Sequence, residues 1–232
     1  VIANLIRFHE FDIIGTQEAW KNQIADLEKS LPEYNWYGVG RNDGIDSAEF
    51  SAIFYKKDKF KLLKSGNFWL STTPENPSFG WDAVICNRVC SWVQLQRIKD
   101  RRKFYVFNTH FDHEGATARI ESSKMVLRKI REIAGDAPVL FTGDLNTDHE
   151  SESYKILANS GLLIDTYQQV KQPYVNNTSF NGFGRSFKGD RIIDHVFTTK
   201  HFSTHKWGLL TDTYYGKFPS DHFPVVAVVT LK

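Results

Sequence analysis

Side chains that could bind a metal ion and activate water recur at the ends of apolar stretches of this chain. They are Glu18, His110, Asp144, Asn146, Asp194 and the Asp221–His222 pair. Carboxylate and amide oxygens are hard ligands, which suit Mg²⁺, or Mn²⁺, better than zinc. Several carboxylates brought together would repel one another unless a cation lay among them. The set therefore predicts a divalent-cation site that supports hydrolysis.

Spacing strengthens some of these candidates and sets other residues aside. Asp144 and Asn146 are two residues apart, so on an extended backbone their side chains face the same side. His195 directly follows Asp194 on a predicted strand and points to the opposite face, which indicates a packing role. Four further histidines have no supporting context: His9, His149, His201 and His205.

The elements that must position these residues alternate along the sequence. Strands are predicted at residues 12–18, 36–40, 50–55, 60–70, 88–98, 103–109, 138–142, 191–198, 202–209 and 223–231. Helices are predicted at residues 1–9, 20–31, 115–134 and 151–159. Residues 166–189 are polar, with Asn and Gly interspersed, and are expected to form a long surface loop near the site. This alternation predicts one layered α/β domain with mixed sheets.

Length and composition fit a single enzyme-sized domain. The chain has 232 residues, 41% of them hydrophobic and 14% aromatic, which is enough for one large core. A net charge of +2 is low for a protein that coats DNA or RNA. Cys86 and Cys90 are too few for a disulfide framework. No apolar run is long enough to span a bilayer. We expect a monomer, and the sequence leaves open whether it is cytoplasmic or exported after loss of a signal segment.

Five strings in the sequence occur together in one known superfamily. They are Gly15-Thr-Gln-Glu18, Asn108-Thr-His110, Gly143-Asp-Leu-Asn146, Ile193-Asp-His-Val-Phe197 and Ser220-Asp-His222. In this order they resemble the endonuclease/exonuclease/phosphatase superfamily, which includes DNase I. The resemblance runs from about Asp12 to the C-terminus. Phe68-Trp-Leu-Ser71 with Gly80-Trp81 resembles its bacterial, deadenylase-like branch.

The resemblance implies a fold and a domain organisation. The expected fold is a DNase I-like four-layer α/β sandwich, with two mixed β-sheets packed face to face and helices outside. Residues 1–232 would form a single domain of this kind. The superfamily pattern normally begins with a strand carrying an Asn metal ligand, and nothing here fills that position. We expect that strand to precede Val1 in the parent protein.

The resemblance also implies roles for the metal-binding and water-binding residues. Glu18 matches the metal-binding Glu, and Asp221 matches an additional Asp of the metal site. Asp144 matches the Asp that orients or deprotonates the attacking water. Asn146 matches the Asn that holds this water or the developing oxyanion.

Further matches concern the phosphoryl group. His222 matches the His beside it, and Asp194 matches the partner carboxylate of that His. His110 occupies the position that contacts the phosphate or the leaving group. Glu49 resembles the Glu that pairs with that His in DNase-like members.

Three residues are candidate substrate contacts. Arg88 and Arg119 could bind phosphate, although a surface Arg that covers apolar area is an equally good interpretation. Trp81 could line the cleft and stack on a base or sugar.

The predicted function is a Mg²⁺-dependent phosphoesterase that hydrolyses a phosphodiester, in nucleic acid or a related small molecule, by in-line attack of an activated water. The first alternative is a phosphomonoesterase or a phospholipid-headgroup hydrolase, of the inositol phosphate or sphingomyelin type. The second alternative is a non-catalytic binding module with the same fold. The five intact strings argue against this last interpretation.

Overall fold

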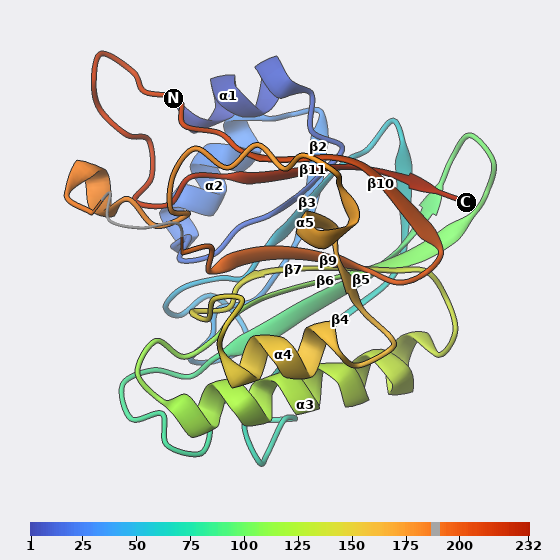
Figure 1. Cartoon of the computed structure of the whole chain (residues 1–232). Coiled ribbons are helices and arrows are strands. Elements are labelled where there is room, and N and C mark those ends of the chain that lie inside the picture. Colours follow the sequence, from blue (N-terminus) through green and yellow to red (C-terminus); the bar gives the residue numbers. More distant parts are fainter. Residues whose placement is uncertain (187–190) are drawn as a thin grey trace.

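Strands and helices alternate along the chain and stack into layers (Figure 1). The computed structural model describes residues 1–186 and 191–232. The helices are α1 (Ile2–His9), α2 (Lys21–Ser30), α3 (Ala116–Ala134), α4 (Glu152–Ala158), α5 (Thr166–Gln169) and the 3₁₀ helix η1 (Gly182–Gly184). The strands are β1 (Ile13–Gly15), β2 (Tyr34–Tyr37), β3 (Ile53–Lys56), β4 (Phe60–Trp69), β5 (Val89–Arg97), β6 (Lys103–His110), β7 (Val139–Asp144), β8 (Ile164–Asp165), β9 (Asp194–Thr198), β10 (Phe202–Leu209) and β11 (Val225–Leu231).

The largest sheet has six strands in the order β4-β5-β6-β7-β9-β8. β6 and β7 run parallel, and the other neighbouring pairs are antiparallel, so the sheet is mixed. Parallel neighbours need a crossover connection, which α3 supplies. Because side chains alternate between the faces of a strand, Phe104 and Val106 of β6 face the second sheet layer. Tyr105 and Phe107 face α3 instead.

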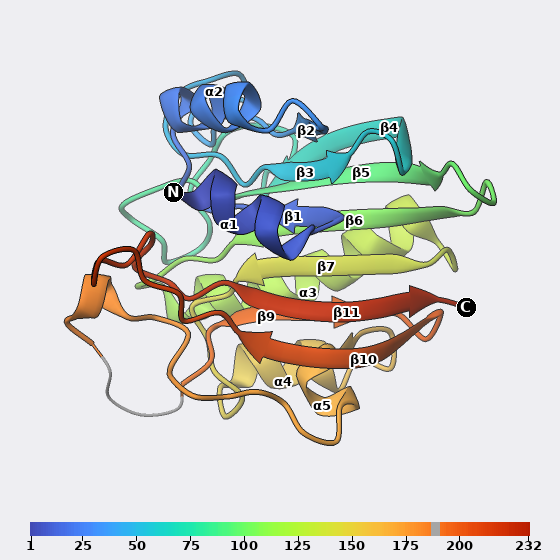
Figure 2. The same cartoon turned by 90° about the horizontal axis from the view of Figure 1, so that it is seen from above.

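The second sheet layer consists of two smaller antiparallel sheets (Figure 2). One has the order β1-β3-β2, and the other pairs β10 with β11. The core between the layers joins side chains of β3, β5, β6 and β7, such as Ile53, Leu95, Val106 and Leu140. The expected four-layer α/β fold is confirmed, with the second sheet divided into these two pieces.

Helices cover both outer faces. α3 and α4 lie on the six-stranded sheet and bury Met125, Ile130 and Leu157 against it (Figure 1). α1 and α2 cover the three-stranded sheet through Ile6 and Ile24. Burying such side chains stabilises each layer by about 1.5–3 kcal/mol per large apolar residue. The rigid layers between them hold the ends of β1, β6, β7 and β9 at fixed positions.

Strand bounds in the second layer differ from the sequence prediction. β1 is shorter than residues 12–18, and β11 begins at Val225 rather than at residue 223. Two further strands differ around one turn. The strand predicted at residues 36–40 lies at Tyr34–Tyr37, and the one predicted at residues 50–55 begins at Ile53. The cause is a turn in which Asp43 Oδ1 accepts hydrogen bonds from three successive backbone N–H groups. An Asp side chain that bonds the following backbone competes with strand pairing. Phe50 forms isolated bridges to Gly40, at the other end of this turn, and to Ala19, instead of lying in β3.

The region predicted as a long loop contains short helices. α5 begins directly after Asp165, whose side chain caps it by accepting a hydrogen bond from Tyr167 N. η1 lies further along the same region. Residues 187–190, which include the end of this predicted loop, lie outside the described residues. Cys86 and Cys90 are both buried and free. No helix in the described part of the chain is long and apolar enough to cross a membrane.

Candidate active site

Three predicted site residues lie side by side across the six-stranded sheet. His110 ends β6 and pairs in register with Asp144 of β7, and Asp144 pairs with Asp194 of β9. Residues opposite each other on neighbouring strands point to the same face. All three side chains therefore gather at one end of the sheet, on the face that meets the second sheet layer.

A tight turn after β7 adds the amide of Asn146 to this group. Asn146 N–H donates to Asp144 Oδ1 at 2.9 Å, and Asn146 has a left-handed φ of 48°. The predicted pair thus meets through a turn rather than along an extended strand. Asn146 Nδ2 donates to His110 Nε2 at 3.0 Å and to the Phe111 carbonyl at 3.1 Å. Burial, followed by the charges of nearby arginines, lowers the pKa of His110 well below its usual value, so its neutral ring can accept this bond.

His222 closes the group from the loop before β11. Its Nδ1 donates to Asp194 Oδ2 at 2.8 Å, and its Nε2 lies 3.7 Å from Asp144 Oδ2. The backbone is held by Asn181, whose N–H donates to the Asp221 carbonyl at 2.7 Å. Asn181 is fully buried, and no pattern in the sequence pointed to this role. The predicted His222–Asp194 partnership is present.

The two central ionisable groups have opposite tendencies. Burial raises the pKa of Asp144 to about 7, and the neighbouring Asp194 charge acts in the same direction. Burial on its own would lower the pKa of His222, but the charges of Asp194, Asp144 and Asp221 outweigh it and raise that pKa to about 10. Asp144 can therefore accept a proton near neutral pH while His222 remains a cation.

Glu18 approaches the group from the opposite sheet. Its Oε1 lies 3.9 Å from His110 Nε2, and its side chain is half exposed. Burial, then the charges of Glu49 and Asp221, raises the pKa of Glu18. Carboxylates that repel in this way are stabilised by a shared cation. The ligand atoms of Glu18, His110 and Asp144 lie within 4.8 Å of one another, and the Glu18 carboxylate at its exposed edge suits a hard divalent cation.

A buried amide fixes the segment that carries Glu18. Asn108 Nδ2 donates to the Thr16 carbonyl at 2.8 Å and to the Ala52 carbonyl at 3.0 Å. Its Oδ1 accepts from Gln17 Nε2 at 2.7 Å and from Thr142 Oγ1 at 2.9 Å. Asn108 lies two residues before His110 and shares its face of β6. One side chain thereby links the two sheet layers directly beneath the site.

Two arginines form one wall of a small pocket beside the carboxylates. The pocket is lined by Glu18, Arg41, Glu49, Phe50, Ser51, Arg88, Val89 and His110. Arg88 is 4% exposed, and its Nε and Nη1 have no hydrogen-bond partner among the described residues. Arg41 Nε is likewise buried without such a partner. Buried guanidinium N–H groups are costly to leave unbonded, so they suit an incoming anion.

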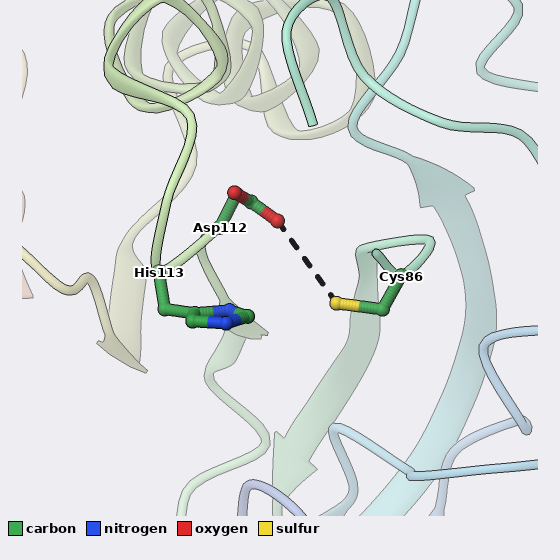
Figure 3. Close-up of side chains that lie close together, drawn as sticks. All are labelled: Cys86, Asp112 and His113. Atoms are coloured by element: carbon green, nitrogen blue, oxygen red, sulfur yellow. Dashed lines mark hydrogen bonds between the residues drawn. The ribbon is translucent and has the colours of Figure 1, made fainter. Parts of the chain in front are cut away.

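The far side of Arg88 rests on a cluster formed by Cys86, Asp112 and His113. Figure 3 shows Cys86 and Asp112 pointing toward each other, with Sγ 3.9 Å from Oδ2, and His113 beside them. Arg88 Nη2 lies 2.9 Å from His113 Nδ1, and Arg88 Nε lies 3.6 Å from Asp112 Oδ2. The guanidinium already supplies a positive charge to this cluster, which therefore anchors Arg88 rather than offering a free metal site.

The remaining predicted substrate contacts have other partners. Glu49 does not pair with His110 as expected; its carboxylate instead binds Arg41 Nη1 at 2.5 Å. Arg119 Nη1 donates to the Asp112 carbonyl at 3.0 Å and so steadies the loop under Arg88. Trp81 lines a different pocket, together with residues of α3. Neither Arg119 nor Trp81 is brought into the group around Asp144.

Comparison with known proteins agrees with this geometry. A model of the Endonuclease/Exonuclease/phosphatase family matches residues 1–222. The solved structure of a mannosyl-6-phosphatase from Bacteroides thetaiotaomicron is 42% identical, with a TM-score of 0.94, over 99% of this chain and 89% of that chain. Uncharacterized protein L388 of Acanthamoeba polyphaga mimivirus is 29% identical over 98% of this chain and 89% of its own length. Tyrosyl-DNA phosphodiesterase 2 of Bos taurus is 24% identical over 98% of this chain but only 61% of its own length.

The chain belongs to the endonuclease/exonuclease/phosphatase family. It is a hydrolase that acts on phosphoester bonds, as members of this family are. The resemblance inferred from the five sequence strings is confirmed.

Proposed function

We propose that this chain is a Mg²⁺- or Mn²⁺-dependent phosphomonoesterase that acts on a phosphorylated sugar. The observation that carries the hydrolytic part is the buried Asp144, flanked by His222 and by the amide of Asn146. A proton acceptor, a cationic donor and an amide thus surround one position at the sheet end. When bound at Glu18, a divalent cation supplies Lewis-acid stabilisation of phosphoryl oxygens.

The side chains of the site divide the reaction among them. Asp144, with its raised pKa, accepts a proton from the attacking water. His222, held as a cation by Asp194, donates from Nε2 to a non-bridging oxygen, where negative charge must be stabilised. Asn146 orients the water through the turn that fixes its backbone to Asp144. His110, neutral and bonded to Asn146, completes the wall next to Glu18.

The arginine wall favours a monoester over a diester. A terminal phosphate carries up to two negative charges and three non-bridging oxygens, whereas a diester carries one charge and two such oxygens. Arg88 and Arg41 hold unbonded, buried N–H groups next to Glu18, which suits the more highly charged group. The similarity to a mannosyl-6-phosphatase, at 42% identity over nearly the whole chain, supports the same choice.

An aromatic ring at the edge of the site suits a sugar. Phe180 lies 5.1 Å from the His222 ring and is 37% exposed. The apolar face of a hexose packs readily on an aromatic ring. Phosphodiester hydrolysis remains the second candidate, supported by the similarity to tyrosyl-DNA phosphodiesterase 2.

A substrate panel separates the two candidates. We would compare hexose 6-phosphates with bis-p-nitrophenyl phosphate and single-stranded DNA, each with Mg²⁺. We expect a kcat/KM for a hexose 6-phosphate at least ~10²-fold above that for any diester, a ratio that a few well-placed charged contacts can supply. A preference for diesters of similar size would overturn the monoester assignment and leave the hydrolase assignment standing.

A further inference from the structure

A second group of possible metal ligands lies behind the catalytic loop. His149 Nε2 and His195 Nδ1 each lie 3.6 Å from the same oxygen, Asp165 Oδ2. The three ligand atoms all lie within 4.8 Å of one another. They come from the turn after β7, from the end of β8 and from β9. Sequence patterns suggested no function for either histidine, and the group plays no part in the mechanism above.

The distances do not fit direct hydrogen bonds. A donor and acceptor 3.6 Å apart are too far from each other to form one. A tetrahedral Zn²⁺ with ligands at about 2.0–2.1 Å would place its ligand atoms about 3.3–3.4 Å apart. The observed spacing is therefore close to that of ligands around one ion.

Hydrogen bonds on the outer side orient two of the ligands. His195 Nε2 donates to the Thr147 carbonyl at 2.8 Å, which leaves Nδ1 as the nitrogen with a free lone pair facing Asp165. Metal-binding histidines ordinarily donate their other N–H in this way. Tyr154 OH donates to Asp165 Oδ2 at 2.8 Å, and Tyr167 N–H donates to its Oδ1 at 2.9 Å.

Burial removes this group from water. Asp165 is 1% exposed and His195 is 3% exposed. His149 Nε2 is buried and has no hydrogen-bond partner among the described residues. A lone pair that faces a buried carboxylate is repelled unless a cation or a second proton lies between them. By contrast with the cluster under Arg88, no guanidinium contacts these three residues in the interactions described.

We propose that His149, Asp165 and His195 bind a structural Zn²⁺, separate from the catalytic cation. Two imidazoles and one carboxylate suit Zn²⁺, whereas the oxygen-rich catalytic group suits Mg²⁺. A water molecule would complete the tetrahedron at the fourth position. The ion would join the loop after Asn146 to β8 and to the residue that follows Asp194, and so stiffen the back of the active site.

The test measures Zn²⁺ bound per chain. Chelator-stripped protein would be equilibrated with Zn²⁺ in excess Mg²⁺, passed through a desalting column and analysed by mass spectrometry for metal. We expect about one Zn²⁺ in the wild type and in Glu18→Gln, and a loss of most of it in His149→Ala. His205→Ala removes an exposed histidine that bonds Thr230 and serves as the matched control. Equal Zn²⁺ in the wild type and His149→Ala would overturn the proposal.

A second measurement does not depend on the folding of a variant. Co²⁺ replaces Zn²⁺ in such sites and absorbs visible light strongly only when it is tetrahedral. We expect this absorption in the wild type and in Glu18→Gln, with competition by Zn²⁺ but not by Mg²⁺. Its absence would contradict the metal site. Neither readout depends on catalysis, so the result is independent of the proposed substrate.

Discussion

Asp144 and Asp194 are directly opposed across the antiparallel pair β7–β9, and His222 lies between the two carboxylates. The imidazole donates to Asp194 at 2.8 Å and lies 3.7 Å from Asp144. Two like charges this close disfavour joint ionisation unless a cation separates them. The arrangement thus gives the three residues different roles: Asp194 holds His222 charged, and His222 in turn stabilises the ionised form of Asp144.

Replacing Asp194 should remove the stabilisation of the charged His222 without unfolding the protein. Asp194→Asn can still bond His222 but no longer holds it as a cation. We expect kcat to fall by about 10²–10⁴-fold with a smaller change in KM, because charge stabilisation acts mainly in the transition state. Steady-state kinetics would measure both kcat and KM. Asp136→Asn, at an exposed position, should leave kcat unchanged, and an Asp194→Asn enzyme as active as that control would contradict the role.

The His222 interaction should also give stability a particular pH dependence. The pKa of His222 is about 10 in the folded protein, against about 6.5 in the unfolded chain. A raised pKa stabilises the folded state fully below pH ~6.5, and that contribution is lost as the pH rises toward ~10.

Urea unfolding with a chelator present would measure this contribution. We expect the free energy of unfolding of the wild type to exceed that of His222→Gln by roughly 1–3 kcal/mol at pH 6. This difference should shrink steadily toward pH 10. A difference that stays constant or grows between these pH values would show that His222 is not held as a cation.

Removing Glu18 should weaken the catalytic metal specifically. Chelation should abolish activity, and Mg²⁺ should restore it. In Glu18→Gln we expect the Mg²⁺ concentration for half-maximal activity to rise about 10-fold or more, because one charged ligand is lost. Glu114→Gln, next to His113 and exposed, is the control. If activity returned at the same Mg²⁺ concentration in Glu18→Gln and Glu114→Gln, that result would argue against Glu18 as a ligand.

Gly15 links the fold to the metal site. A Cβ at this position would lie 2.5 Å from both Asn108 Oδ1 and Thr142 Oγ1. Gly15→Ala should therefore displace Asn108, cost about 1–3 kcal/mol of stability and raise the Mg²⁺ requirement, since Gln17 and Glu18 follow on the same segment.

A second glycine, Gly135, allows the loss of stability to be separated from the raised Mg²⁺ requirement. Gly135 has φ 56° and ψ −126°, and a Cβ added there would meet open space, so Gly135→Ala should cost about 1–3 kcal/mol through backbone strain alone. Urea unfolding and Mg²⁺ titration would be run on both variants. An unchanged Mg²⁺ requirement in Gly15→Ala would separate Asn108 from the metal site.

Much of the site follows from local sequence, and the rest depends on long-range pairing. Glu18, Asp144 and His222 stand in strings that identify the family, and each lies in the site. The register that places His110 beside Asp144 joins strands far apart in the sequence, so no local pattern reveals it. Arg41 becomes a site residue only because the turn at Asp43 brings it to the pocket.

Fold prediction shows the same division. The spacing of apolar residues predicts β5, β6 and α3 well, because burial on one or both faces of a strand, or on one face of a helix, determines that spacing. The division of the second sheet layer into β1-β3-β2 and β10-β11 depends on which strands pair. The expected pairing of Glu49 with His110 is wrong because Arg41 lies closer and binds that carboxylate.

Mg²⁺-dependent release of phosphate from mannose 6-phosphate, compared between the wild type and Asp144→Asn, tests the proposed chemistry most directly. Asp144→Asn keeps the shape of the side chain and the bond from Asn146 N–H, but it removes the proton acceptor. We expect saturable release by the wild type and a rate at least ~10²-fold lower in the variant, with unchanged thermal stability or a gain. Equal rates in the two proteins, or no Mg²⁺-dependent release by the wild type, would contradict the proposed role of Asp144 in a sugar phosphatase.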